Sequence, residues 1–151
     1  MDERQKFDDF FNAATSLVDR CVAQAYKSGQ VFRVVFFLSS GKEYMIQSDL
    51  LEDGEEIGYI VVDPHNSDIE DHYASDVVME NFHIDSVDFF NVEGCPFPSR
   101  IVLRTSRGTI YISSDGFPYG VSYRVNDKSV GHPQYDDNEY VLDYTLSRRA
   151  R

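Results

Sequence analysis

The sequence predicts a single α+β domain over residues 1–151, in which a long N-terminal helix packs on a mostly antiparallel sheet of about seven to eight strands, with one further short helix. Three observations predict this fold class. A helical apolar stripe begins the chain, strand-like segments separated by turns follow it, and neither a repeat nor a linker divides it. Because the helix comes first and the strands follow, the order favours α+β over a parallel α/β fold.

The first predicted element is a helix from Asp2 to Ser28. Its apolar residues recur in steps of four and three, which is the helical period. These residues are Phe7, Phe11, Ala14, Val18, Cys21 and Ala25. Gly29 follows, at a position where helices often end in a left-handed residue.

Strands are predicted next, by β-branched and aromatic runs that lie between turn residues. Residues 31–38 and 43–48 form a predicted hairpin. The first of these runs is apolar at nearly every position, which predicts a strand covered on both faces, with the N-terminal helix across one of them. Further strands are predicted at 57–63, 86–92, 100–106, 109–114, 121–126 and 139–146.

A short helix is predicted from about Ser67 to Asn81. Ser67 and Glu70 have the spacing of a capping box, and apolar residues beyond them fall on one helical face. The run Val77–Met79 also fits a strand, so that alternative stays open. At the end of the chain, residues 147–151 are predicted to form a frayed basic tail.

Acidic residues are concentrated in the middle third of the chain. The net charge is −12, and residues 43–99 hold 15 Asp and Glu with no Lys or Arg, whereas both flanks are close to neutral. Such a field repels nucleic acid and anionic membranes, and it attracts basic proteins over a Debye length of about 8 Å at physiological salt. The sequence therefore predicts a basic protein partner, with no direct nucleic-acid or membrane binding.

The two cysteines, Cys21 and Cys95, lie far apart in the sequence, which excludes a CxxC redox pair and a cysteine-rich zinc site. We expect two free thiols, with a single disulfide between them as the alternative. The first residues carry mixed charge instead of the basic and apolar regions of a signal peptide, and no apolar run reaches the length of a membrane span. These features predict a cytoplasmic protein.

Carboxylates and imidazoles crowd residues 63–72, where Asp63, His65, Asp68 and His72 are the candidate metal ligands. The spacing does not fit an EF-hand loop, and the two histidines lack the i, i+4 separation of a helical zinc pair. A solvated loop followed by an acid-rich helix start explains the same residues. We therefore predict no metal and no cofactor.

No motif commits the chain to a reaction. The sequence lacks the GxSxG and SxxK serine motifs, the GxxxxGK[ST] phosphate loop and a GxGxxG turn after a strand. Cys95 stands in acidic surroundings, which raise a thiol pKa and disfavour a thiolate nucleophile. We predict no catalytic residues and expect that the protein is not an enzyme.

Basic and aromatic residues are interleaved in the last third of the chain, as they are on single-stranded nucleic-acid surfaces. The charged members are Arg100, Arg104, Arg107, Arg124 and Lys128. The charge of the whole protein opposes a polyanion, and Arg104 and Arg107 flank a predicted hairpin turn, where charged side chains protect exposed strand positions, so we favour this structural role over a nucleic-acid surface. Internal pairing of these arginines with the acidic middle third is a further alternative.

The predicted function is that of an inhibitor or immunity-type antagonist, which docks without catalysis on a basic toxin or nucleic-acid-handling protein. The predicted contacts are acidic residues of the middle third and two aromatic loop residues. They are Glu52, Asp53, Glu55, Glu56, Asp68, Glu70, Asp71, Asp76, Phe117 and Tyr119. Two alternatives stay open: a cytosolic chaperone or adaptor that holds a peptide, and a metal-dependent enzyme that uses residues 63–72. The sequence predicts no oligomeric state.

Overall fold

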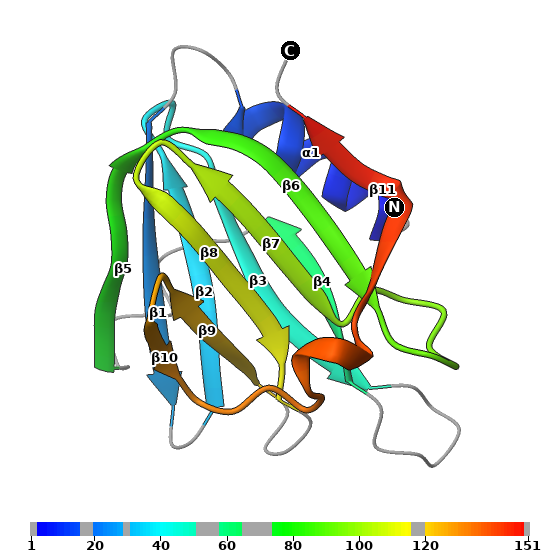
Figure 1. Ribbon diagram of the computed structural model, residues 1–151. Helices are drawn as coiled ribbons and strands as arrows, with labels where there is room; N and C mark the ends of the chain where they lie inside the picture. The colour runs from blue at the N-terminus through cyan, green and yellow to red at the C-terminus, as the bar shows by residue number, and fades with distance from the viewer. Residues whose placement is uncertain are drawn as a thin grey trace.

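The computed structural model describes residues 3–15, 20–28, 31–50, 58–64, 74–115 and 120–149. In these residues the protein is mostly β, with two antiparallel sheets that lie face to face and a single α-helix (Figure 1). The predicted α+β class is therefore wrong, since the core is enclosed by two sheets and not by a long helix on one sheet.

The first sheet has five strands in the order β4-β3-β2-β1-β5. These strands are β1 (Cys21–Ser28), β2 (Val31–Leu38), β3 (Glu43–Leu50), β4 (Gly58–Pro64) and β5 (Ala74–Phe82). The second sheet has six strands in the order β10-β9-β8-β7-β6-β11. They are β6 (Ile84–Asn91), β7 (Arg100–Thr105), β8 (Gly108–Ser114), β9 (Val121–Val125), β10 (Lys128–Val130) and β11 (Val141–Arg149).

The two sheets share a corner where β5 continues into β6 (Figure 1). Asn81 stands just before this corner with φ at 52°, a left-handed conformation that Asn adopts more readily than most residues. At the bend, the amide of His83 donates to Ser106 Oγ at 2.9 Å, and the amide of Ser106 donates to the carbonyl of His83 at 2.9 Å. These bonds hold the bend while the chain passes from the first sheet to the second.

The predicted N-terminal helix is correct only in its first half. Helix α1 spans Glu3–Ala14, and the amide of Thr15 donates to the carbonyl of Phe11 at 3.0 Å as the helix ends. The second half of the predicted helix contains β1 instead. Small residues alternate inward along this strand (Cys21, Ala23 and Ala25 are all buried), and β1 forms ladders with β2 on one side and β5 on the other. The apolar residues of this segment fit both the helical period of 3.6 residues and the strand period of 2, and pairing with strands on both sides favours the strand.

The predicted short helix is wrong over residues 74–81, which form strand β5; residues 67–73 lie outside the described part of the chain. The strand alternative for Val77–Met79 is the correct one. The predicted frayed basic tail is wrong over residues 147–149, and residues 150–151 lie outside the described part of the chain. Strand β11 extends to Arg149, and Arg148 and Arg149 pair with Val87 and Ser86 of β6.

The predicted hairpins are confirmed. β2 pairs with β3 in antiparallel register, and β7 pairs with β8 across a two-residue turn that places Thr105 opposite Gly108. Gly108 has φ at 125°, a conformation that L side chains rarely adopt, so glycine suits this turn. The predicted strand at 57–63 is present as β4.

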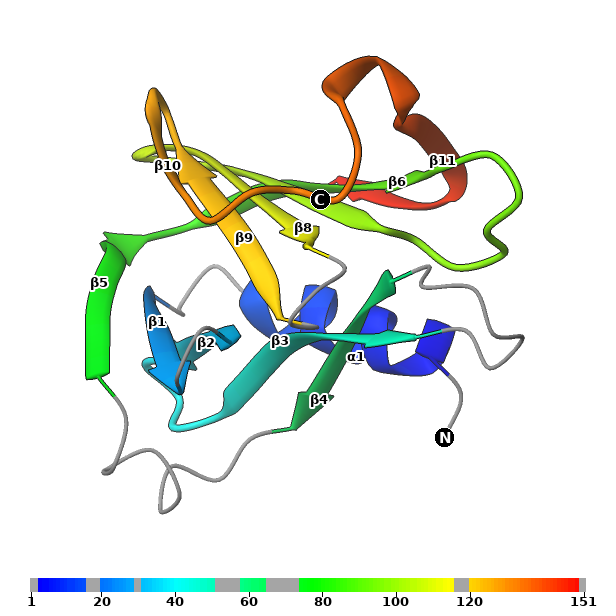
Figure 2. The ribbon, with the colours of Figure 1, turned by 90° about the horizontal axis from the view of Figure 1, so that it is seen from below.

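The core lies between the two sheets and is closed at one end by α1 (Figure 2). Phe7, Phe10, Phe11 and Ala14 of α1 are all buried there. The ring of Phe10 meets Phe36 of β2 at a centroid distance of 5.3 Å, so the helix does contact one face of that strand as expected. Large apolar groups from both sheets thus pack around one short helix.

The margin of the first sheet at β4 is joined to the second sheet. The amide of Ile60 donates to the carbonyl of Pro98 at 2.7 Å, and the amide of Gly58 donates to the side chain of Gln134 at 3.1 Å. The hydroxyl of Ser114 donates to the carbonyl of Gly58 at 3.2 Å. The other margin of the first sheet, at β5, has no ladder partner on its outer side among the described residues.

Candidate functional site

Most of the predicted contact residues lie outside the described residues. These are Glu52, Asp53, Glu55, Glu56, Asp68, Glu70, Asp71, Phe117 and Tyr119. The remaining one, Asp76, lies on β5, where it is exposed and stands opposite Ala25 of β1. The predicted contact surface is therefore described only at β5, which belongs to the acidic middle third.

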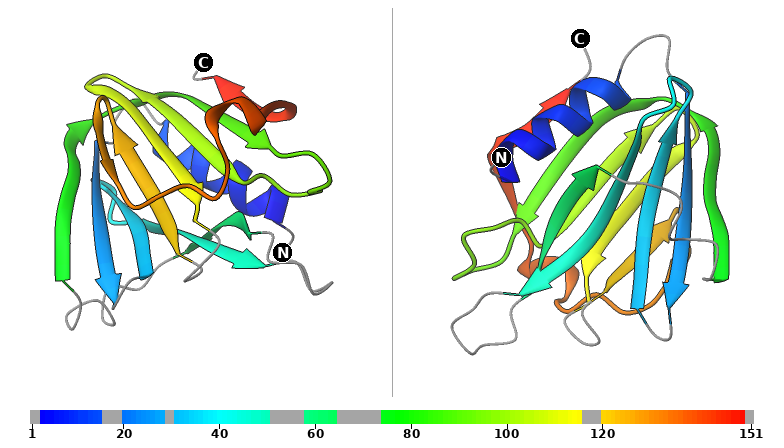
Figure 3. Two further views of the ribbon diagram at one scale, coloured as in Figure 1. Left: turned by 60° about the horizontal axis from the view of Figure 1, so that its bottom comes forward. Right: turned by 180° about the vertical axis from the view of Figure 1, so that it is seen from behind.

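Strand β5 lies at the margin of the molecule, as both views of Figure 3 show. Its inner edge pairs with β1, with Val77 opposite Gln24. Val77 has 53% of its surface exposed, and Asp76 and Glu80 are exposed beside it. In an antiparallel sheet, alternate residues of a strand direct their N–H and C=O groups toward the neighbouring strand on one side, and the residues between them direct these groups to the other side. A strand at the edge of a sheet therefore presents half of these groups to the solvent. We name Ala74–Phe82 with its exposed side chains the β5 edge.

Carboxylates outnumber cations near the β5 edge, where the exposed Lys27 of β1 stands opposite Ala74. Burial raises the pKa of the Tyr123 hydroxyl, and the carboxylate of Asp76 raises it further. The guanidinium of Arg107 donates to the carbonyl of Glu80 at 3.1 Å, at the end of the strand. Asp85, just beyond the corner, is also exposed. An incoming segment at the β5 edge thus meets main-chain groups and carboxylates together.

The candidate metal cluster is described at Asp63 alone, because His65, Asp68 and His72 lie outside the described residues. Both carboxylate oxygens of Asp63 are engaged by protein groups. Lys6 Nζ lies 2.8 Å from Oδ1, and Gln47 Nε2 donates to Oδ2 at 2.8 Å. Across the described parts of the chain, no group of three His, Cys, Asp or Glu residues is placed to hold a metal ion.

Both cysteines are free and buried, as the sequence predicts. Cys95 lies in a small cluster with Val92 and Tyr140. Burial raises the pKa of its thiol, and the thiol donates to the carbonyl of Phe97 at 3.2 Å. A buried thiol with a raised pKa is a poor nucleophile at neutral pH.

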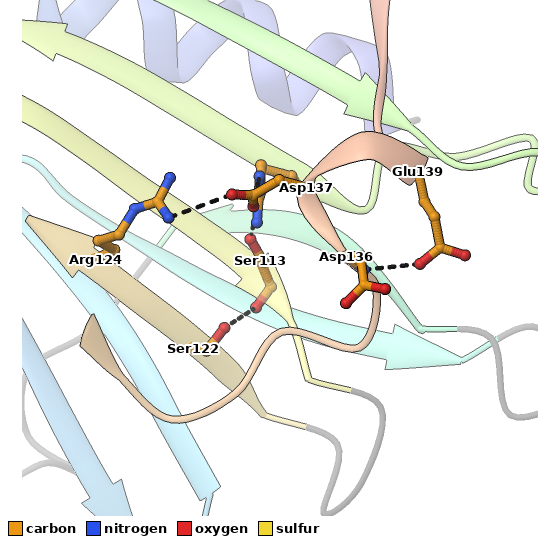
Figure 4. Close-up of polar contacts among 7 residues, drawn as sticks. Ser113, Ser122, Arg124, Asp136, Asp137 and Glu139 are labelled. Atoms are coloured by element: carbon orange, nitrogen blue, oxygen red, sulfur yellow. Dashed lines mark hydrogen bonds and ion pairs between the residues drawn. The ribbon is translucent and has the colours of Figure 1, made fainter.

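A second polar site, which the sequence did not single out, lies on the outer face of the second sheet (Figure 4). Its centre is Arg100, whose side chain is only 7% exposed. Arg100 Nε donates to Ser113 Oγ at 2.7 Å, and Arg100 Nη1 donates to Asp137 Oδ1 at 3.0 Å. Arg124 Nη1 lies 3.6 Å from the other oxygen of Asp137. One carboxylate therefore bridges two guanidinium groups.

Aromatic rings hold both guanidinium groups of this site in place. Arg100 Cζ lies 3.9 Å from the centroid of the Tyr140 ring, and Arg124 Cζ lies 4.1 Å from that of Tyr111. Such stacking stabilises a cation by about 0.5–2 kcal/mol, with the larger values at desolvated positions. The short 3-10 helix η2 (Asp137–Glu139) brings Asp137 over the sheet, and the amide of Asp136 donates to Glu139 Oε2 at 2.7 Å.

A cavity of about 60 Å³ adjoins the two arginines, and we name it the arginine pocket. It is lined by Arg100, Tyr111, Ser113, Ser122, Tyr123, Arg124, Ser129, Gly131 and Pro133. The hydrogen bond from Arg100 holds the pKa of Asp137 below its usual range, with smaller support from Arg124. The nearby Tyr140 hydroxyl is buried without a hydrogen-bond partner of good geometry in the described residues, and burial raises its pKa.

Internal pairing of the arginines follows the expectation only in part. Arg104 lies 3.7 Å from Asp88, which does belong to the acidic middle third. Arg100 and Arg124 instead share Asp137, which lies outside it. The predicted strands 100–106 and 109–114 join at residues 107–108 and would set Arg100 opposite Asp115, whereas the observed register sets it opposite Ser113. Nothing in the sequence indicated that η2, which carries Asp137, lies over the outer face of the second sheet.

Comparisons with protein-family models, with curated proteins and with solved structures found no match to this chain. Within the residues that the structure describes, no helix is long and apolar enough to cross a membrane. Two features of the described surface therefore bear on function, the β5 edge and the arginine pocket.

Proposed function

We propose that this protein is a non-catalytic acidic binding protein, which docks on a basic partner protein through the β5 edge. The observation that carries the proposal is the position of β5. Among the described residues it is an outer strand of the first sheet, and it lies within a 57-residue stretch, residues 43–99, that contains no Lys or Arg. The partner class is a basic toxin or nucleic-acid-handling protein, for which the chain acts as an inhibitor or immunity-type antagonist.

Docking at the β5 edge would use both the open strand and its carboxylates. An extended segment that adds to an open strand gains main-chain hydrogen bonds, and side chains on alternate residues supply the specificity. Lys or Arg residues of the incoming segment would meet Asp76 and Glu80, and an apolar residue would cover the exposed Val77. Carboxylates also accelerate the encounter with a basic protein at low salt. A row of carboxylates resembles the phosphates that such a partner binds.

The carboxylates of the β5 edge also protect it from self-association in the free protein. Open edges invite unwanted pairing between copies, and charged side chains along an edge discourage it. Two copies of an edge that carries Asp76 and Glu80 repel one another, whereas a basic segment is attracted. The same carboxylates thus favour the partner over self-association.

The proposal is tested by capture of partners from lysates of the host and of its rivals, with elution by increasing salt. We expect a basic protein that wild-type protein retains and that the variant Asp76→Lys/Glu80→Lys loses. Glu93→Lys is the control, since Glu93 is exposed in the same acidic segment but lies after β6. Equal capture by wild type and the double variant would reject docking at the β5 edge.

The chaperone or adaptor alternative uses the same edge for an apolar peptide and differs in its dependence on charge. For that function, charge reversal on β5 would leave capture largely unchanged and salt would not release the bound segment. The enzyme alternative gains no support from the described residues, because Lys6 and Gln47 engage Asp63. The cytoplasmic location stays a proposal, to which the two free cysteines lend support.

A further inference from the structure

We propose that the arginine pocket binds a small tetrahedral oxyanion, phosphate or sulfate, on the outer face of the second sheet. This site is independent of the β5 edge, since it is built from β7, β8, β9, β10 and the segment that follows β10. The binding groups are two guanidinium groups and the hydroxyls of three serines, which are Ser113, Ser122 and Ser129.

The donors of Arg100 are only partly used. Its side chain is 7% exposed, Nε donates to Ser113, and Nη1 donates to Asp137. A guanidinium group carries five N–H donors, and the bonds to Ser113 and Asp137 use two of them. An acceptor in the adjoining cavity would accept hydrogen bonds from further donors of this group.

The balance of charge at the pocket favours an anion. Arg100 and Arg124 contribute two positive charges, and Asp137 is the carboxylate that neutralises one of them. The carboxylate of Asp137 is 65% exposed, so it lies at the rim and leaves the interior beside the arginines open. Planar guanidinium groups bind oxyanions through paired hydrogen bonds, which a second positive group strengthens.

The size and shape of the pocket limit the ligand. The pocket offers about 60 Å³, and one water occupies about 10–15 Å³. This space is sufficient for a small anion of about five heavy atoms. Ser122 is buried at the base, and a side chain at Gly131 would lie 3.1 Å from the Cβ of Ser122. A glycine at position 131, with φ at 78°, therefore keeps this part of the pocket clear.

Two features keep the expected affinity modest. The net charge of −12 opposes any anion at long range, and Asp136 and Glu139 lie beside Asp137 on the same segment. Short-range hydrogen bonds from buried donors act against this field, because local interactions are screened far less than distant ones. We expect a dissociation constant on the order of 1 mM for inorganic phosphate.

The test is a titration with inorganic phosphate at pH 7, with sodium chloride adjusted so that ionic strength stays constant. Constant ionic strength matters because screening alone stabilises a protein of high net charge. The Nε–Hε resonances of Arg100 and Arg124 report binding directly. We expect saturable shifts, reproduced by sulfate and not by chloride. Shifts that fail to saturate, or that chloride reproduces equally, would overturn the proposal.

Three variants separate binding from structural support. Arg124→Gln is expected to weaken phosphate about tenfold, whereas Arg107→Gln, the same charge change on an exposed turn, leaves the affinity unchanged. Ser129→Asp places a carboxylate at the exposed wall of the pocket and is expected to abolish binding without altering the core. Asp137→Asn removes the competing carboxylate and is expected to tighten phosphate about threefold or more. Because a purely structural ion pair predicts no tightening, an unchanged or weaker affinity in Asp137→Asn would contradict the oxyanion site.

Discussion

The amide of Ile60 on β4 donates to the carbonyl of Pro98 at 2.7 Å, and this bond joins the two sheets at the margin opposite the β5–β6 corner. The margin at β4 is thereby closed, while the outer side of β5 is open in the described structure. Among the described residues, β5 is thus the margin of the first sheet that no strand or loop closes, and it belongs to the acidic middle third.

Replacement of Phe10 by alanine should strongly destabilise the protein. The Phe10 side chain is fully buried and meets Phe36 and Tyr44 at centroid distances of 5.3 and 5.4 Å. We expect the free energy of unfolding to fall by about 3–5 kcal/mol, measured by urea denaturation. Asn12→Ala, an exposed change in the same helix, is the control and should shift the value by less than about 0.5 kcal/mol. Similar effects of both substitutions would show that α1 does not close the core.

Substitutions of Asn81 by glycine and by valine should differ in their effect on stability. The φ of 52° there is readily adopted by glycine and is strained for valine. We expect Asn81→Gly to be neutral or mildly stabilising and Asn81→Val to cost about 1–3 kcal/mol. Thermal unfolding monitored by circular dichroism measures the difference. If valine were tolerated as well as glycine, the left-handed bend would not be required.

Arg100→Ala should be costly even though it removes a charged group. The guanidinium is stacked on Tyr140 and hydrogen-bonded to Ser113, so the substitution opens a void and leaves Ser113 Oγ without its donor. A loss of about 2–4 kcal/mol in unfolding free energy is expected. Arg107→Ala, on the exposed turn between β7 and β8, serves as the matched control with a change below about 0.5 kcal/mol. Equal losses for the two variants would refute a supporting role for Arg100.

Asp137 should make stability depend on pH in the acidic range. Because its pKa is lowered in the folded protein, chiefly by the hydrogen bond from Arg100, the carboxylate contributes stability above its unfolded-state pKa. That contribution is lost as the pH falls through the lowered folded-state pKa. Asp137→Asn should therefore be less stable than wild type at pH 7, by no more than about 1 kcal/mol because the group is largely exposed.

The check is the difference in unfolding free energy between wild type and Asp137→Asn, measured from pH 7 downward. We expect a constant difference down to about pH 4, near the ordinary carboxyl pKa, and a decline below it. A difference that grows as the pH falls would have the wrong sign for this mechanism.

Local signals predicted the hairpins, and they did not predict the class of the fold. The strand Val31–Leu38 is rich in β-branched residues, and Gly108 directly follows the two-residue turn at 106–107, so the sequence determines both hairpins locally. Strand β1 depends on partners up to about sixty residues away, since Phe82 pairs with Cys21. Its alanines favour a helix in isolation, and the ladders on both sides override that preference.

The two candidate sites differ in how far the sequence predicted them. The absence of Lys and Arg from residues 43–99 indicated the acidic surface, and Asp76 was among the predicted contacts. That β5 would be the outermost strand required the sheet order, which no local pattern encodes. For the arginine pocket, the pairing of Arg100 with Ser113 depends on a register two residues away from the one that the predicted strands imply, and the position of Asp137 depends on how a loop folds back.

The most direct test of the central claim is amide hydrogen exchange across Ala74–Phe82, measured by mass spectrometry with and without the basic protein captured through Asp76 and Glu80. Strand addition predicts slower exchange along β5 in the complex, because alternate amides gain partners, and the slowing should disappear in Asp76→Lys/Glu80→Lys. Unchanged exchange in this strand, with protection elsewhere on the molecule, would contradict docking at the β5 edge.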